Sequence, residues 1–177
     1  LLFFPDQVRT LRPHTQLPFE VHLMTTDPAA WVQPFAEAGA NVIIFSFDSV
    51  TDPRALIEKI LAAGCQAGAA LRGTDSVDLL DKWWRELEIV TLLGTELGIK
   101  GASMHPSLPE KVRAARARIR TAGAHTLVEA DGGIRRETVP LLAQAGADFI
   151  VPGSLMFKEN PAEMRRWLAT LELRVER

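Results

Sequence analysis

The sequence predicts an α/β fold with a parallel sheet, and two observations point to it. Strand-sized apolar runs alternate with helical patterns along the whole chain, with no linker or low-complexity tract between them. Four segments also repeat one plan, a helix ending in Ala-Gly, a short turn and an apolar strand: "EAGANVIIFSF", "AAGCQAGAAL", "TAGAHTLVEA" and "QAGADFIVPG". Their glycines, Gly39, Gly64, Gly123 and Gly146, suit the left-handed backbone that follows a helix. Strict alternation implies right-handed crossovers between parallel strands.

The individual elements follow from local signals. The strands are near-continuous apolar runs, as expected for strands buried on both faces. We predict them at residues 17–24, 41–46, 66–71, 88–93, 125–130 and 148–152. Helices begin at prolines or capping residues such as Pro28, Pro53 and Ser76. We predict them at residues 5–13, 28–38, 53–63, 77–87, 107–122, 136–145 and 161–171.

Two architectures fit this order, an open doubly wound sheet and a TIM (β/α)8 barrel whose first two strands are not represented. A usual barrel has about 200 to 250 residues, and the shortfall in this 177-residue chain matches two strands and one helix. The chain begins with Leu1 inside an apolar stretch, so we expect the natural N-terminus to lie upstream. We therefore predict one barrel domain over residues 1–177 that lacks its N-terminal portion.

Composition narrows the function classes. The net charge of −2 argues against binding to nucleic acid or to a membrane surface. No apolar run is long enough to span a membrane, and no signal-peptide pattern is visible. The single cysteine, Cys65, excludes an intrachain disulfide and fits a reducing, cytoplasmic location. Apolar helix faces make a homo-oligomer plausible.

Two predicted strands end at glycines. Gly132 and Gly133 follow the strand at 125–130, and Gly153 and Ser154 follow the strand at 148–152. In a barrel these turns lie at the active-site face, where backbone N–H groups, the Ser154 hydroxyl and helix N-termini could bind a phosphate. The alternative is that these glycines only form tight strand-to-helix turns.

A third glycine-containing loop, residues 92–106, follows the strand at 88–93 and carries Gly94, Gly98 and Gly101. It is long enough to form a flap over a ligand. Lys100 in this loop could attract a phosphate, but we expect it to be a solvated lysine.

An imidazole and a carboxylate also occur at strand ends. His22 and Asp131 fall on predicted strands so that, in a barrel, both could point into the same mouth. Such a pair is half of a site for zinc, iron(II) or manganese, with Glu20 and Glu129 as acids below that orient the ligands. The alternatives are a core histidine bonded to a carbonyl, and an aspartate that caps a helix.

Three stretches together resemble the ribulose-phosphate 3-epimerase family: "FEVHLMTTDPAAWVQPFAEAGAN", "VEADGGIRRETVPLLAQAGADFIVPGSLMF" and "HPSLPEKV". The resemblance runs from about residue 5 to the end of the chain. It implies a TIM barrel of the ribulose-phosphate-binding type, and a metal-dependent epimerase that inverts one carbon of a ketose phosphate by 1,1-proton transfer through an enediolate.

The resemblance also assigns roles to residues. His22 corresponds to a metal ligand, and Asp131 to an aspartate that is both a ligand and one of two acid/base groups. Met24 corresponds to a methionine that walls off the enediolate. The phosphate grip corresponds to Gly132, Gly133, Gly153 and Ser154, and the flap glycines to Gly98 and Gly101. A second His ligand and a second catalytic Asp belong to a family motif like "H.D.MDG.F.PN", which these 177 residues do not contain.

The sequence departs from the family in three segments that would surround the sugar part of the substrate. "LGTELGIKGAS" stands where the family flap has a Pro-Gly-Phe-Gly-Gly-Gln type of sequence, "LRGTDS" replaces an Asn-Pro-x-Thr-Pro turn, and "FSFDS" lacks a histidine. We predict a divergent epimerase that acts on ribulose 5-phosphate/xylulose 5-phosphate or a related sugar phosphate. We expect a divalent metal, zinc first, with iron(II), manganese or cobalt as alternatives.

Two other functions compete with this prediction. One is a decarboxylase or aldolase-like synthase, which would use a strand-end lysine that this chain lacks outside the flap. The other is a barrel that binds a sugar phosphate without turnover or with a different specificity.

Overall fold

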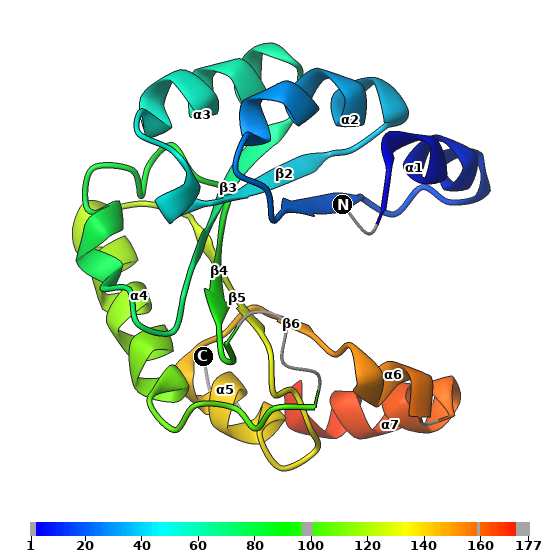
Figure 1. The fold of residues 1–177 in the computed structure, drawn as a ribbon. Coiled ribbons are helices and arrows are strands. Elements are labelled where there is room, and N and C mark those ends of the chain that lie inside the picture. Colours follow the sequence, from blue (N-terminus) through cyan, green and yellow to red (C-terminus); the bar gives the residue numbers. More distant parts are fainter. Residues whose placement is uncertain (1–2, 97–100, 159, 173–177) are drawn as a thin grey trace.

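The computed structural model describes residues 3–96, 101–158 and 160–172. Its strands form one parallel sheet in the order in which they follow along the chain. They are β1 (Glu20–Leu23), β2 (Val42–Ser46), β3 (Gln66–Leu71), β4 (Ile89–Leu93), β5 (Leu127–Asp131) and β6 (Phe149–Val151). The sheet curls into a C that is open between β1 and β6 (Figure 1). The architecture is therefore a parallel α/β half-barrel rather than a flat open sheet.

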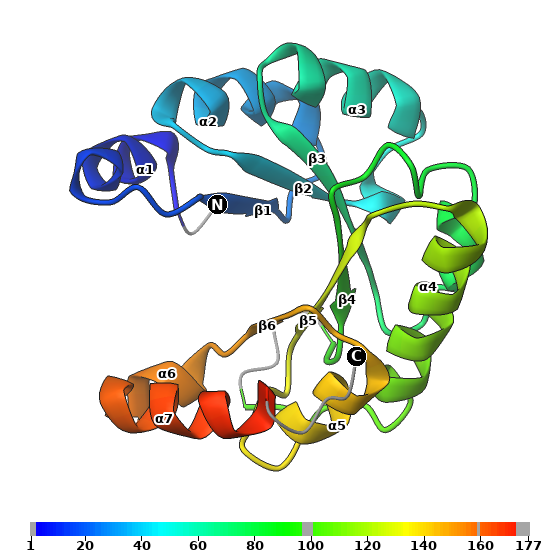
Figure 2. The same cartoon turned by 180° about the vertical axis from the view of Figure 1, so that it is seen from behind.

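Helices connect the strands and cover the convex side of the sheet (Figure 1). They are α1 (Pro5–Leu11), α2 (Val32–Ala38), α3 (Pro53–Ala62), α4 (Leu108–Ala122), α5 (Val139–Ala145), α6 (Ser154–Lys158) and α7 (Pro161–Glu172), with short 3-10 turns at Arg12–His14, Pro28–Trp31, Phe47–Ser49 and Val77–Leu80. Helices α1 to α3 gather at the β1 end of the C, and α5 to α7 at the β6 end (Figure 2). The helix-ending glycines Gly39, Gly64, Gly123 and Gly146 all have positive φ, as predicted.

The predicted strands are confirmed to within a few residues, but one helix prediction is wrong. Residues 77–87 do not form an α-helix; a 3-10 turn at Val77–Leu80 is followed by further turns. Ser76 does cap this turn, because its hydroxyl accepts a hydrogen bond from Asp78 N at 3.2 Å. Beyond it, the Thr126 hydroxyl donates to the carbonyl of Trp84, whose indole is buried in the core. Tertiary contacts of Trp84 therefore replace the helical hydrogen bonds that the local pattern favours.

Alternate residues of each strand face opposite sides of the curled sheet. The side toward the helices carries the main core, which includes Ile43, Phe45, Leu92 and Val128, all with no measurable exposure. The concave side has a small apolar cluster of Ile44, Ala70 and Ile89. Register places His22 beside Ile44, Thr91 beside Ala70, and Glu129 beside Thr91. Polar side chains and this cluster therefore share the concave face.

Within the described ranges, no helix combines the length and the apolar character that a membrane crossing requires. Cys65 is buried and its thiol donates to Ala40 O at 3.3 Å, as expected of a structural cysteine.

The helix-facing layer generates a stability prediction. Replacing Leu92 by Ala should lower the free energy of unfolding by about 2–5 kcal/mol, because Leu92 is fully buried between β4 and the helices. Urea titration followed by circular dichroism measures the change. The matched control is Leu61→Ala on α3, where the side chain is 50% exposed and the expected cost is about 0.5 kcal/mol. Equal losses in both variants would contradict this assignment of the core.

Candidate active site

A buried acid, Glu129, and an exposed one, Glu20, lie on the concave face below the strand ends. The hydroxyl of Thr91 on β4 donates to Glu129 Oε1 on β5 at 2.9 Å, and Glu129 is only 5% exposed. The carboxyl of Glu20 on β1 lies beside that of Glu129. Burial, reinforced by the charge of Glu20, raises the pKa of Glu129 to about 8. The pair thus holds a proton near neutral pH and links β1 to β5 across the inside of the curl.

Asp131 is the last residue of β5 and opens into a cavity of about 310 Å³. Burial raises the pKa of its carboxyl, while a hydrogen bond from the backbone of Gly132 opposes the rise. The predicted alternative, a helix cap, is not what the structure shows. The next helix, α5, begins at Val139 and has Thr138 at its N-cap. The carboxyl of Asp131 is therefore directed to the cavity and its glycine turn.

The glycine turn after Asp131 packs against the loop that follows β4. Gly133 has φ of +69°, and a Cβ at this position would overlap the backbone of Met104. Gly94 N donates to Asp131 O at 2.6 Å, and His105 N donates to Gly94 O at 2.8 Å. Only glycine permits the contact at 133, so the loop and the turn form one wall of the cavity.

The cavity beside Asp131 gathers most of the residues predicted to bind phosphate. Besides Asp131, it is lined by Gly132, Gly133, Gly153, Ser154 and Gly101. The remaining flap glycine, Gly98, lies outside the described residues, as does Lys100. The two glycine turns that the sequence singled out therefore do meet at one cavity.

His22 and Met24 line a different cavity, of about 490 Å³, at the β1 edge of the sheet. The Nε2 atom of His22 is buried and has no hydrogen-bond partner among the described residues. The predicted alternative, a histidine bonded to a carbonyl through this nitrogen, is therefore not observed. Burial lowers the pKa of His22, which favours the neutral imidazole that coordinates metals. Met24 is 55% exposed, and its role in shielding an enediolate stays a prediction.

His22 and Asp131 both lie on the concave face of the sheet, and that they share one metal site stays a prediction. They line separate cavities because β1 ends the described sheet and the space beside His22 extends outward toward α1. Among the described residues, no three or more His, Cys, Asp or Glu side chains gather at a metal-binding distance. An unpartnered imidazole and a carboxylate fit the chemistry of a zinc-type ion, but they supply only part of a ligand set.

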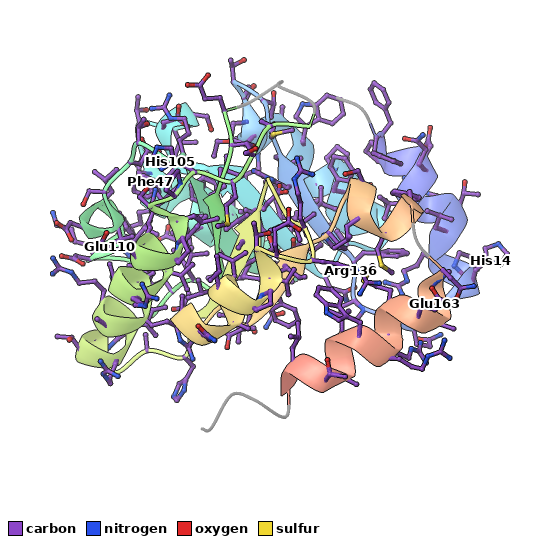
Figure 3. The ribbon with its side chains drawn as sticks, turned by 90° about the horizontal axis from the view of Figure 1, so that it is seen from below. His14, Phe47, His105, Glu110, Arg136 and Glu163 are labelled. Carbon is purple, nitrogen blue, oxygen red and sulfur yellow. The ribbon has the colours of Figure 1, made fainter. Side chains whose placement is uncertain are left out.

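The other histidines lie at the surface of the molecule. His14, His105 and His125 are all exposed, and His14 projects from the edge of the molecule beside α1 (Figure 3).

Sequence reasoning missed the basic residue that lines the Asp131 cavity, Arg135. It follows the glycine pair in "DGGIRR". A basic residue two positions after a glycine turn was the available signal.

Comparison with known proteins decides the family. The profile described as the ribulose-phosphate 3 epimerase family matches residues 1–157. The chain belongs to this family. A ribulose-phosphate 3-epimerase of Chlamydia pneumoniae is 33% identical over 166 residues, covering 93% of this chain and 72% of that protein. The Bacillus subtilis ribulose-phosphate 3-epimerase is 31% identical over 157 residues, covering 88% of this chain and 72% of that protein. The predicted resemblance and enzyme class, an epimerase-like isomerase, are thereby confirmed.

Solved structures support the fold. A mutant form of the tryptophan synthase α-subunit from the hyperthermophile Pyrococcus furiosus has a TM-score of 0.67 at 18% identity, over 95% of this chain and 68% of that one. At this identity the likeness concerns the fold alone, and it places the six-stranded half-barrel of this ribulose-phosphate 3-epimerase family member among TIM-barrel-type proteins.

The buried carboxyl of Glu129 predicts a pH dependence of stability. In the folded state Glu129 keeps its proton up to a pKa of about 8, whereas the unfolded chain releases it near 4.5. The folded state binds more protons between these values, so the free energy of unfolding should fall as pH rises from about 5 to 8. Glu129→Gln, which keeps a hydrogen-bonding side chain but cannot titrate, should remove this part of the slope. Urea midpoints measured with a chelator present test it.

The matched control is Glu58→Gln on α3, an exposed carboxyl beside Arg54, which should leave the slope unchanged. If Glu129→Gln and the parent protein give parallel curves, Glu129 is not protonated in the folded state.

Proposed function

We propose that the protein is a metal-dependent epimerase of a ketose phosphate, either ribulose 5-phosphate/xylulose 5-phosphate or a related sugar phosphate. The observation that carries the proposal is the cavity in which the Asp131 carboxyl lies beside two glycine turns. A proton-transfer group and a set of donors for an anion are what such a reaction needs at the two ends of its substrate. Family membership supplies the reaction class.

The glycine turns would bind the phosphate. Gly132, Gly133 and Gly153 have positive φ, which lets successive backbone N–H groups approach an anion closely. Ser154 adds an exposed hydroxyl donor. Phosphate held here would place the sugar chain toward Asp131, since all these residues line the same cavity.

Asp131 would move the proton. Partial burial raises the pKa of this carboxyl, which makes it a stronger base than a solvated aspartate. It would take the proton from the carbon beside the ketose carbonyl on one face, which gives the enediolate. Inversion requires a second acid/base group on the other face, the aspartate that the resemblance places outside these 177 residues.

His22 and Asp131 would hold the metal, together with the His and Asp implied by the missing family motif. The neutral imidazole with its unpartnered Nε2 and the carboxylate suit zinc, iron(II), manganese or cobalt. When bound, such an ion would polarise the carbonyl and stabilise negative charge on the substrate oxygens. The Glu20–Glu129 pair lies two residues before each ligand and would orient both strands.

One observation favours the alternative of a sugar-phosphate-binding barrel without turnover. Met24 is 55% exposed, whereas a methionine that shields an enediolate should be covered. Solvent-deuterium exchange at the substrate carbon separates the two functions, because binding alone exchanges nothing.

Replacing Asp131 by Asn should lower kcat by about 10²–10⁴-fold, since the amide cannot accept the proton. Loss of deuterium incorporation from D2O into the ketose phosphate should accompany it. Phosphate binding should persist because the glycine turns remain. The matched control is Asp6→Asn on α1, an aspartate whose side chain is 87% exposed, which should match the parent protein. Undiminished exchange in Asp131→Asn would remove Asp131 from the reaction.

Removing the metal should abolish turnover, and His22→Ala should weaken metal retention, because the buried Nε2 would no longer coordinate. Metal content after dialysis, measured by atomic emission, gives a readout independent of activity. His125→Ala, an exposed histidine, is the matched control and should retain the metal. Full turnover by chelated, metal-free protein would exclude the metal-dependent mechanism.

A further inference from the structure

We propose that Arg135 is a specificity-determining residue of this site. It holds residues 101 and 102 against the glycine turn and sets a positive charge beside the phosphate of the substrate. This inference rests on the proposed function and deepens it, because it names the group that selects a phosphorylated ketose over a neutral one.

The backbone of Arg135 is fixed by a closed turn. Arg135 N donates to the Thr138 hydroxyl at 2.8 Å, and that hydroxyl lies 3.0 Å from Gly133 O, to which it can donate. Thr138 N donates a hydrogen bond to Arg135 O at 3.1 Å. One threonine side chain therefore ties both ends of residues 133–138, so the arginine side chain starts from a defined position.

The guanidinium of Arg135 reaches the loop that follows β4. Its Nη2 donates to Gly101 O at 2.8 Å and to Ala102 O at 3.2 Å. Gly101, Ala102 and Arg135 all line the cavity of about 310 Å³ that contains Asp131. The charged group is therefore at the rim of the proposed phosphate site, and it is half-buried, which strengthens its interactions relative to a solvated arginine.

The guanidinium has donors left for a ligand. Both carbonyl contacts use Nη2, and among the described residues its Nε and Nη1 make no hydrogen bond. Each of these remaining N–H groups can donate to a phosphate oxygen, and the guanidinium keeps its positive charge. The clamp to two carbonyls also limits rotamer freedom, so less conformational entropy is lost when an anion binds.

The charge balance of the cavity calls for such a cation. Asp131 places a carboxyl in the same space where a phosphate dianion would enter, and the two repel each other. Among the described residues that line the cavity, Arg135 is the sole basic side chain. The helices that follow the two turns, α5 and α6, are too short to supply a comparable field. Arg135 therefore provides the compensating charge.

The test uses Arg135→Met and Arg135→Lys in the full-length protein, with Arg113→Met, an exposed arginine of α4, as the matched control. The probe is inorganic phosphate, whose dissociation constant is measured by calorimetry at fixed ionic strength. Steady-state kinetics with the ketose phosphate provide KM and kcat. Circular dichroism and the thermal midpoint verify that each variant is folded.

We expect Arg135→Met to weaken phosphate binding by about tenfold or more and to raise KM similarly, with a smaller effect on kcat, since charge-assisted hydrogen bonds to the anion are lost. Arg135→Lys should recover part of the phosphate affinity because it keeps the positive charge but lacks the separate N–H donors of the guanidinium. Arg113→Met should match the parent. If Arg135→Met fails to fold, the phosphate affinity of Arg135→Lys still shows whether the positive charge or the hydrogen bonds to the Gly101 and Ala102 carbonyls matter.

Unchanged phosphate affinity in a folded Arg135→Met would overturn the inference. Equal losses in the methionine and lysine variants would also overturn it, because the carbonyl clamp alone would then explain the effect. Failure of the parent protein to bind phosphate would overturn the inference as well. If the parent binds phosphate, the methionine variant weakens that binding and no ketose phosphate is turned over, the role of Arg135 stands and the proposed epimerase function fails.

Discussion

The alternation of side chains along the curled parallel sheet is the constraint on which the rest of the molecule depends. Ile43 and Phe45 face the helices with no exposure, while Ile44 between them faces the concave side. The same alternation on β5 sends Val128 into the core and Glu129 and Asp131 to the concave side. A shift by one residue would bury these acids under the helices without partners. Core and site are therefore specified by one register.

A buried acid in such a place requires a compensating arrangement. Glu129 has the Thr91 hydroxyl on one side and the Glu20 carboxyl on the other, so its oxygens are satisfied although water is largely excluded. The pair connects the strand of His22 with the strand of Asp131. The half-barrel thus carries, below its strand ends, a polar link between the two residues that would share a metal.

The sequence was sufficient for features that local chemistry determines. Apolar runs located the strands, and Ala-Gly pairs located the helix ends. The glycine turns at 132–133 and 153 were expected to lie together because the carboxyl ends of parallel strands share one edge of the sheet. Features set by distant contacts escaped it. Residues 77–87, where the indole of Trp84 is buried in the core, do not form the predicted α-helix. His22 lies on the edge strand β1 and lines a cavity apart from that of Asp131. The side chain of Arg135 contacts a loop some thirty residues away along the chain.

The close approach of Gly133 to Met104 also bears on how this scaffold could be modified. Because no side chain fits between them, and because Gly94 bonds to the carbonyl of Asp131, the loop after β4 and the turn after β5 behave as a single interlocked module. Grafting either segment alone from a relative would bring in a surface with no matching counterpart. Engineering a new ketose preference here would mean transplanting both segments together.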